Sequence, residues 1–201
     1  MSEKQEDGQA TGDLGQEFST TIEADHPTPR YVYHWKPEDM RGETLYPLNE
    51  LKSKYPDLYT EAADKYENRE FLRDYVIPPL GCKWNDALFL SPIGPEQIRA
   101  ALLEQDFDFH GEFYEIDASK LAPERTTIYT FKDIAFDAVL DPNNYVPYSP
   151  ENLKRLSTIP EATKQFYKEN LTDEGVLYFA HIPHILYRGT LDVTDVRTIK
   201  V

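Results

Sequence analysis

Histidine and carboxylate side chains are the groups of this sequence best suited to chemistry, and two of them stand at informative positions. His34 lies between Tyr33 and Trp35, in the middle of a segment that alternates large rings with other side chains. A polar ring inside a strand must find a hydrogen-bond partner, which the protein usually supplies and a ligand sometimes does. Glu174 comes directly before an apolar stretch at 176–180. Most acids at such points are solvated, but a carboxylate at the mouth of a strand is also a common position for one that acts on a bound ligand.

A second group of side chains suits a metal ion. Asp106, Asp108 and His110 lie together in an acidic and aromatic segment, and His181 comes later in the chain. Carboxylate oxygens are the ligands that Mg²⁺ and Mn²⁺ prefer, so a metal-dependent hydrolase or nuclease is one alternative function. The same segment also fits a simple connection between strands. Because His181 and His184 flank a proline and no His-Glu-x-x-His pattern occurs, we assign no metal ligands.

The sequence offers little support for a nucleophile or a phosphate-binding loop. Among its 9 glycines there is no Walker, Gly-x-Gly-x-x-Gly or Gly-x-Ser-x-Gly pattern. The single cysteine, Cys82, would need a histidine nearby in space to act as a nucleophile. A small, partly buried thiol is the more common role for an isolated cysteine. Trp84, Asn85 and Asp86 precede an apolar segment and suit either a turn or a pocket wall.

These side chains need elements to position them, and the first half of the chain predicts one strand followed by helices. The alternation at 30–35 is typical of a strand. Apolar residues then follow helical spacing at 48–55, and Pro56 can occupy the first position of a second helix. Three residues spaced seven apart would share one face of that helix: Tyr59, Tyr66 and Arg73. Prolines at 78 and 79 end it.

The rest of the chain predicts strands with two further helical regions. The predicted strands are 87–91, 112–117, 126–131, 176–180, 185–193 and 196–201. One helix should begin at Pro95 and another at Pro150, where Ser149 supplies a capping hydroxyl. Pro160 should divide this second helical region in two. Helices grouped in this way, without regular βαβ alternation, indicate the α+β class.

Composition separates an arm from one domain. Residues 1–28 hold seven acidic residues and one lysine, with few large apolar groups, which predicts a disordered acidic arm. Residues 29–201 then form a single α+β domain. The formal net charge of -15 argues against constitutive DNA binding. Because we find no signal peptide, no apolar run near the roughly 18 residues of a membrane span, and one cysteine, we expect a cytoplasmic protein without membrane contact.

The order of these features resembles the ADP-ribosyltransferase superfamily, which includes the mono-ADP-ribosylating toxins. In that family the first strand carries a His or Arg, a later strand carries a Ser or Tyr, and the catalytic Glu precedes another strand. The similar segments here are 32–35 with His34, 87–92 with Ser91, and 172–177 with Glu174. The segments 112–121 and 182–193 also resemble the family's middle strand and the strand that follows its catalytic Glu.

The resemblance implies a split antiparallel sheet with NAD bound as a substrate in its cleft. The activity would be that of an ADP-ribosyltransferase or NAD glycohydrolase, which cleaves the nicotinamide–ribose bond through an oxocarbenium-like state. Glu174 would stabilise the developing positive charge, and His34 would hold the nicotinamide or ribose end. The other implied cofactor-binding residues are Tyr33, Trp35 and Tyr66 for stacking, Ser91 in the pocket wall, and Arg69 and Arg73 for the pyrophosphate.

Two questions stay open at this point. Many family members carry Glu or Gln two residues before the catalytic Glu, where this chain has Thr172, so the acceptor could be a protein, a nucleic acid, a small molecule or water. The second question is whether the chain is instead an acidic, non-enzymatic interaction protein or nucleic-acid mimic that binds a basic partner. NAD should stabilise the transferase and a divalent ion the hydrolase. The mimic should respond to neither and should bind its partner with strong salt dependence.

Overall fold

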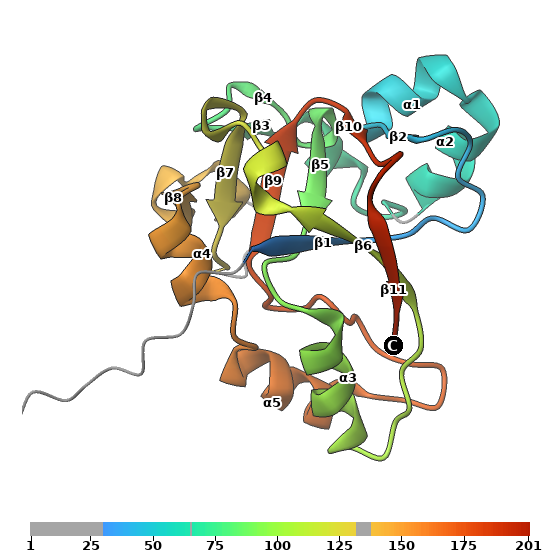
Figure 1. The fold of residues 1–201 in the computed structure, drawn as a ribbon, viewed down its shortest axis with the longest axis vertical. Coiled ribbons are helices and arrows are strands. Elements are labelled where there is room, and N and C mark those ends of the chain that lie inside the picture. The colour runs from blue at the N-terminus through green and yellow to red at the C-terminus, as the bar shows by residue number, and fades with distance from the viewer. Residues whose placement is uncertain (1–29, 65, 132–137) are drawn as a thin grey trace, which may run out of the picture.

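The computed structural model describes residues 30–64, 66–131 and 138–201 (Figure 1). The predicted arm at 1–28 lies outside the described residues. The described part contains both helices and antiparallel sheets, which confirms the α+β class. None of the helices in these three ranges is long and apolar enough to cross a bilayer.

The larger sheet has four strands in the order β5, β9, β7, β8. Their bounds are β5 Ala87–Leu90, β9 His184–Arg188, β7 Thr126–Tyr129 and β8 Tyr145–Pro147. Every neighbouring pair is antiparallel, with Leu88 opposite Tyr187 and Ile128 opposite Ile185. Both edges of β9 are therefore occupied, by β5 on one side and β7 on the other.

The smaller sheet has three antiparallel strands, with β6 between β1 and β11. Their bounds are β1 Tyr31–Trp35, β6 Glu112–Asp117 and β11 Arg197–Lys200. The two sheets meet where Tyr33 and Ser91 pair. The Tyr33 N–H donates to the Ser91 carbonyl at 2.9 Å, and the Ser91 N–H donates to the Tyr33 carbonyl at 2.7 Å.

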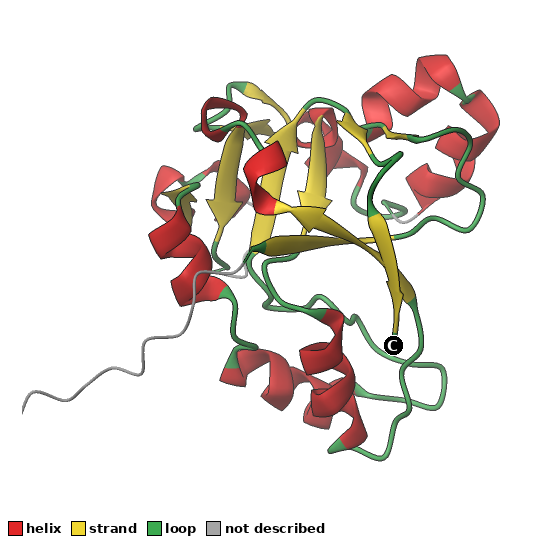
Figure 2. Ribbon diagram, in the orientation of Figure 1, coloured by secondary structure: helices red, strands yellow, loops and turns green. Residues whose placement is uncertain are grey.

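Two short strand pairs and five α-helices accompany the two sheets, together with several short 3₁₀ helices. β2 (Thr44–Leu45) pairs with β10 (Leu191–Asp192), and β3 (Val76–Ile77) pairs with β4 (Cys82–Lys83). The helices are α1 Leu48–Lys54, α2 Pro56–Asp64, α3 Pro95–Leu103, α4 Pro150–Leu156 and α5 Glu161–Asn170. In Figure 2, α1 and α2 lie at one end of the molecule, and α3 and α5 lie at the other.

Side chains from the two sheets bury three apolar clusters. The cluster between the sheets includes Val32, Leu90 and Ile185. The outer face of the four-stranded sheet packs under the α1–α2 region through Trp84 and its neighbours. The outer face of the three-stranded sheet packs against α3 and α5 through Phe113 and its neighbours. Each sheet is therefore covered on both faces. β1 and β5 lie where the cluster under α1 and α2 adjoins the cluster under α3 and α5.

Local signals placed several element boundaries correctly. The Ser149 hydroxyl accepts a hydrogen bond from the Asn152 N–H at 3.2 Å, so Ser149 caps α4 as predicted. Prolines occupy the first positions of α2, α3 and α4. Residues 112–117 form β6 as predicted. The predicted strand 185–193 is divided into β9 and β10 by Gly189, whose φ of 128° a strand does not adopt.

Two predicted elements are wrong. The helix expected to carry Tyr59, Tyr66 and Arg73 ends at Asp64, and Asn68 has a φ of 62° before a 3₁₀ helix at Glu70–Asp74. Those three side chains therefore do not share a helix face. Residues 176–180 form turns instead of a strand, with the Ala180 N–H donating to the Leu177 carbonyl at 3.0 Å. Because β5 and β7 already occupy both edges of β9, this segment cannot pair there.

Candidate functional site

The junction of the two sheets positions His34. Tyr33 directs both backbone polar groups toward β5, whereas the Lys36 N–H donates to the Glu112 carbonyl beside β6. The backbone N–H and C=O groups of successive residues point to alternate sides of a strand. The Trp35 carbonyl therefore points to the same side as the Tyr33 carbonyl. At Trp35, however, β5 no longer pairs with β1. The carbonyl therefore faces the region where the two strands separate.

The His34 ring occupies that region. Its Nδ1 lies 2.5 Å from the Trp35 carbonyl oxygen. Because a carbonyl oxygen only accepts hydrogen bonds, Nδ1 must carry the proton. The half-buried imidazole is thereby held at the point where the three-stranded and four-stranded sheets part. The resemblance implies that this histidine of the first strand would hold one end of NAD.

Tyr33 and Trp35 lie on the opposite face of β1 from His34. Val32 shares the His34 face and is buried between the sheets, whereas Tyr33 and Trp35 pack against the α3–α5 cluster. Burial raises the pKa of Tyr33 to about 12, and the carboxylates of Glu115 and Glu96 add to this effect. The structure therefore does not bring His34 and the two aromatic rings onto one wall.

One side of the Tyr33 ring borders a shallow hollow of about 250 Å³. Gly94, at the start of α3, lies beside this ring, so that a Cβ added there would lie 3.6 Å from the hydroxyl of Tyr33. The hollow is lined by Arg30, Tyr31, Tyr33, Pro92, Gly94, Glu96, Gln97 and Ser157. It contains one of the predicted cofactor-binding residues and none of the others.

Trp35 is surrounded by aromatic rings of the protein. Its ring lies edge-on to Phe109 at 5.7 Å and to Phe113 at 5.0 Å, and it stacks on Tyr178 at 6.3 Å with an interplanar angle of 13°. Tyr178 therefore stacks on the Trp35 ring, where the resemblance implies that NAD would stack. Trp35 is half-buried and Trp84 is buried.

Glu174 lies at the tip of an exposed turn that is attached to this aromatic cluster. The turn is closed by hydrogen bonds between Thr172 and Gly175, at 3.0 and 3.2 Å. Gly175 has a φ of 109°, and a Cβ at this position would lie 2.7 Å from the Tyr178 hydroxyl. Because Tyr178 stacks on Trp35, the turn is fixed next to the end of β1. The Glu174 carboxylate itself stays exposed.

Ser91 uses its hydroxyl within its own loop. The side chain is 4% exposed. Its Oγ donates to the Ile93 carbonyl at 2.9 Å and accepts from the Ile93 N–H at 3.0 Å. These two bonds form the turn that leads from β5 into α3. The position agrees with the predicted pocket strand, but the hydroxyl serves the fold in the described structure.

Tyr66, Arg69 and Arg73 gather at the other end of β5, around Trp84. Burial raises the pKa of Tyr66 to about 12, opposed by a hydrogen bond with Trp84 and by the positive charges of Arg69 and Arg73. A strand rises about 3.3 Å per residue, so β5 places this group about 13 Å or more from Ser91. The predicted cofactor-binding residues therefore form two groups, one at each end of β5.

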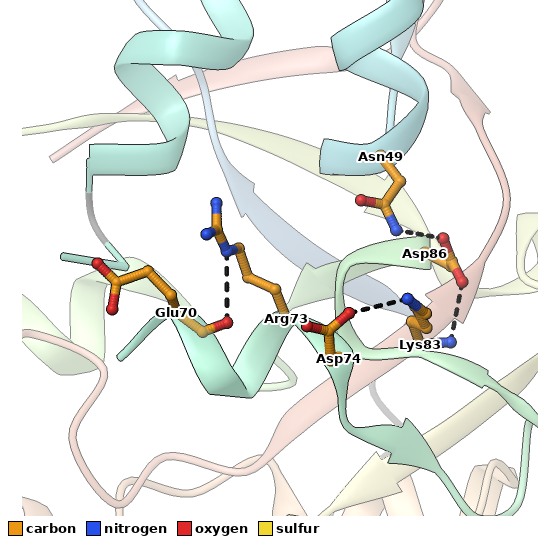
Figure 3. Close-up of polar contacts among 6 residues, drawn as sticks. All are labelled: Asn49, Glu70, Arg73, Asp74, Lys83 and Asp86. Carbon is orange, nitrogen blue, oxygen red and sulfur yellow. Dashed lines mark hydrogen bonds and ion pairs between the residues drawn. The ribbon is translucent and has the colours of Figure 1, made fainter. Parts of the chain in front are cut away.

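Polar contacts link α1, the 3₁₀ helix at Glu70–Asp74 and the segment at 83–86 (Figure 3). Asn49 on α1 donates to Asp86 at 2.6 Å, and Asp86 accepts the Lys83 N–H at 2.9 Å. The Lys83 ammonium contacts Asp74 at 2.8 Å. Arg73 donates from Nε to the Glu70 carbonyl at 3.4 Å.

Arg73 also borders a hollow of about 380 Å³. The hollow is lined by Tyr59, Thr60, Ala63, Asp64, Glu67, Glu70 and Arg73. Three carboxylates and one guanidinium give this lining a net negative charge. The surroundings of Arg73 thus oppose the binding of a pyrophosphate there.

The residues proposed for a metal site do not form one in the described structure. Asp108 pairs with Arg99 at 2.7 Å and with the His110 ring at 3.3 Å. His181 lies against Phe166, with ring centroids 5.5 Å apart. Within the three described ranges, no group of three or more His, Cys, Asp or Glu side chains is arranged to hold a metal ion. The metal-dependent hydrolase gains no support from these residues.

Sequence reasoning missed three rings beside Ser91. Phe89, two residues before Ser91 on β5, lies 6.0 Å from the ring of His184, and His184 lies 4.9 Å from the ring of Phe131. All three side chains are half-buried. Alternation within 87–91 was a usable signal for Phe89. The other two come from β9 and the end of β7, which only the strand pairing brings together.

No family model, curated protein or solved structure matches this chain.

Proposed function

We propose that the protein is an NAD-dependent ADP-ribosyltransferase or NAD glycohydrolase, and that the junction of β1 and β5 is the place where NAD binds. One observation carries the proposal. The His34 ring donates a hydrogen bond to the Trp35 carbonyl in the region where β1 separates from β5. The resemblance implies a split antiparallel sheet and a first strand that carries a His. Two antiparallel sheets that meet at the Tyr33–Ser91 pair support that arrangement.

A second contact determines where the Glu174 turn lies. The stacking of Trp35 on Tyr178 fixes the turn at 172–175 beside the end of β1. The carboxylate is exposed. Its turn adjoins the Trp35 face of β1, opposite the face that carries His34, so the proposed role requires the ligand to extend past the end of β1. Its hydrogen-bond acceptors are suited to a ribose hydroxyl and to a neighbouring positive charge.

The proposed reaction breaks the bond between C1′ of the ribose and the nicotinamide nitrogen. The electron pair of that bond moves to the nicotinamide ring, which leaves as a neutral molecule, and C1′ becomes electron-deficient. Glu174 stabilises the oxocarbenium-like state, and this contact is strongest when the positive charge is greatest. Water or another hydroxyl then bonds to C1′ and releases its proton. Among the other residues that the resemblance implies, Tyr33 borders the junction and belongs to the proposed NAD-binding set. Trp35 and Ser91 support the fold of the junction, and Tyr66, Arg69 and Arg73, at the other end of β5, are not part of the proposed site.

The test compares two adjacent carboxylates. Glu174→Gln keeps the size of the side chain and removes its charge. We expect nicotinamide release to fall on the order of 10²–10³-fold, with nearly unchanged NAD affinity in a thermal-shift titration. Asp173→Asn is the matched control, because Asp173 lies on the same exposed turn and loses the same charge. It should retain nicotinamide release within about twofold of wild type, because salt largely screens the charge of an exposed side chain.

His34→Ala gives a complementary result. It removes a ground-state contact, so NAD binding should weaken more than the rate of the bound complex. The proposal fails if the wild-type protein neither binds nor cleaves NAD in the presence of protein, nucleic-acid and small-molecule acceptors. If Glu174→Gln and Asp173→Asn behave alike, the catalytic assignment of Glu174 is wrong. Salt-dependent binding of a basic partner without any response to NAD would favour the acidic interaction protein instead.

A further inference from the structure

The edge of β1 at Tyr31 presents backbone polar groups toward the β5 side. The Tyr33 N–H and carbonyl pair with Ser91 on that side, whereas the Arg30 carbonyl accepts from the Ala118 N–H on the β6 side. Backbone groups of successive residues point to alternate sides of a strand, so those of Tyr31 point the same way as those of Tyr33. Among the described residues, no group bonds to the Tyr31 N–H or carbonyl. An antiparallel partner residue placed there would exchange two hydrogen bonds with Tyr31.

The chain turns away from this edge immediately after Ser91. Pro92 follows and has no N–H, and the next residues lead into α3 (Figure 1). The Ile93 N–H is also used, because it donates to the Ser91 hydroxyl at 3.0 Å. β5 therefore does not continue opposite Tyr31. The hollow of about 250 Å³ beside Tyr33 lies in this place, between the start of β1 and the start of α3.

The hollow carries one negative charge that the described residues leave unbalanced. A Cβ added at Gly94 would lie 2.9 Å from a Glu96 carboxylate oxygen and 3.6 Å from the Tyr33 hydroxyl, so the carboxylate adjoins the ring. Arg30, the one cation in the lining, is already paired with Asp117 at 3.2 Å. Glu96 forms no ion pair with any residue that the structure describes. The hollow is therefore suited to a cationic group.

We propose that this hollow binds an extended peptide segment that carries a lysine or an arginine. One residue of the segment pairs with Tyr31 through two backbone hydrogen bonds, as a strand added to the β1 edge. Residues directly opposite each other in a sheet point to the same face, so its side chain lies beside Tyr31 on the face of β1 that also carries Tyr33. A cationic side chain at this position contacts the Tyr33 ring and pairs with Glu96.

The size and the charge of the surroundings favour this kind of partner. The hollow is smaller than the roughly 300–1,000 Å³ typical of a small-molecule pocket, whereas an open strand edge recognises the main chain of a peptide. The formal net charge of -15 attracts a basic partner at long range. The inference goes beyond the proposed function, because the Tyr33 ring and the hollow lie on the face of β1 opposite His34.

The experiment uses two capped pentapeptides with the full chain. One is acetyl-Thr-Val-Lys-Val-Thr-amide, and the other has norleucine in place of the lysine, which keeps the aliphatic stem and removes the charge. NMR titration of the isotope-labelled protein should give at least about threefold tighter binding of the lysine peptide, as expected when an exposed cation contacts a ring and a carboxylate. Equal affinities, or no binding of either peptide, would overturn the inference.

Amide hydrogen exchange locates the backbone contact. The Tyr31 N–H should exchange fast in the free protein, and about tenfold more slowly when about 90% of the protein holds the lysine peptide, because only the free fraction then exchanges. The Val32 N–H is the internal control, since it faces β6 opposite Ile116, and its exchange rate should not change. An ester oxygen in place of the lysine N–H removes one of the two bonds to Tyr31 and should weaken the peptide by about two- to tenfold. Binding that leaves the Tyr31 exchange rate unchanged would overturn the proposed site.

Two variants test the contact with Glu96. Glu96→Gln keeps the size of the side chain and removes its charge, so it should lower the preference for the lysine peptide by at least about twofold and leave the norleucine peptide unaffected. Glu104→Gln is the matched control, because Glu104 is exposed at the other end of α3, and it should bind both peptides as wild type does. Equal effects of the two variants would overturn the role of Glu96. Circular dichroism checks the fold of each variant.

The exchange rate of the Tyr31 N–H also separates this partner from two other occupants of the edge. Protection without peptide that disappears on dilution would show that a second copy of the chain occupies the edge. Protection without peptide at every protein concentration would show that the chain's own residues before Arg30 occupy it. Either result would overturn the inference, whereas fast exchange that only the peptide slows would support it.

Discussion

Replacing Ser91 with alanine should lower stability and leave NAD turnover nearly unchanged. The hydroxyl makes two hydrogen bonds, to the carbonyl and from the N–H of Ile93, at 2.9 and 3.0 Å. Ile93 is 0% exposed, so water cannot replace the lost partner without entering the core. Ser91→Ala therefore leaves a buried donor and a buried acceptor without the side chain that joined them.

The expected loss follows from these two bonds. A typical intramolecular hydrogen bond contributes about 0.5–1.5 kcal/mol, so the free energy of unfolding should fall by about 1–3 kcal/mol. For a domain of this size each kcal/mol shifts the melting temperature by about 2–4 °C. Removal of one oxygen from a side chain that is 4% exposed leaves a small cavity, which adds to the loss.

Urea unfolding measures the effect directly. The transition midpoint should fall while its slope with denaturant stays the same, because the surface exposed on unfolding hardly changes. Ser157→Ala is a useful control, since the half-buried Ser157 hydroxyl makes one bond, to the Lys154 carbonyl at 3.0 Å. It should cost less than Ser91→Ala. Unchanged stability of Ser91→Ala together with a large loss of NAD binding would refute this reasoning, because the hydroxyl would then serve the ligand instead of the turn.

Three further predictions test other parts of the structure. Gly189→Ala should destabilise the protein by about 1–3 kcal/mol, because Gly189 has a φ of 128° and the added Cβ would lie 1.8 Å from the Arg125 guanidinium. Urea unfolding should show a smaller loss of stability when Arg125 is also replaced by alanine. An equal loss with and without Arg125→Ala would contradict the clash. Asn85→Leu should leave the free energy of unfolding unchanged or raise it by about 1 kcal/mol, since the Asn85 Oδ1 is buried without a hydrogen-bond partner among the described residues; a clear decrease would show that the amide is satisfied. Stability should fall as the pH drops from about 6.5 to about 4, because the unfolded state takes up a proton on His184 before the folded state does. The upper limit of this loss is about 3 kcal/mol, and partial exposure of the residue makes the loss smaller. His184→Phe should lack this pH-dependent loss when the two proteins are compared across the same pH range.

The sequence by itself determined the elements that depend on local signals. A proline at the first position of a helix has the required φ, and its missing N–H costs nothing there; α2, α3 and α4 each begin in this way. The Ser149 cap depends on a contact three residues away. Alternation of large rings with other side chains predicted β1, because side chains of a strand alternate between faces in any sheet. The residue types of 112–117 predicted β6.

Tertiary structure decided the elements whose partners are distant in the chain. Residues 176–180 are apolar enough for a strand, but β5 and β7 occupy both edges of β9, and the segment uses its backbone in turns while Tyr178 stacks on Trp35. The helix predicted through Tyr66 ends early, at Asp64, and Tyr66 is instead buried against Trp84. Neither outcome follows from spacing, because each depends on which other surface is available.

The candidate site shows the same division. The residue types at His34, Ser91 and Glu174 could be selected from the sequence because each stands at the end or the middle of a recognisable segment. Their grouping could not, since it depends on which way each side chain points once β1 lies between β5 and β6. The pairing of Tyr33 with Ser91 determines that the His34 ring lies at the junction and the Trp35 ring lies in the α3–α5 cluster. Phe131 and His184 join Phe89 only because antiparallel pairing brings β7 and β9 together, across about fifty residues of intervening chain.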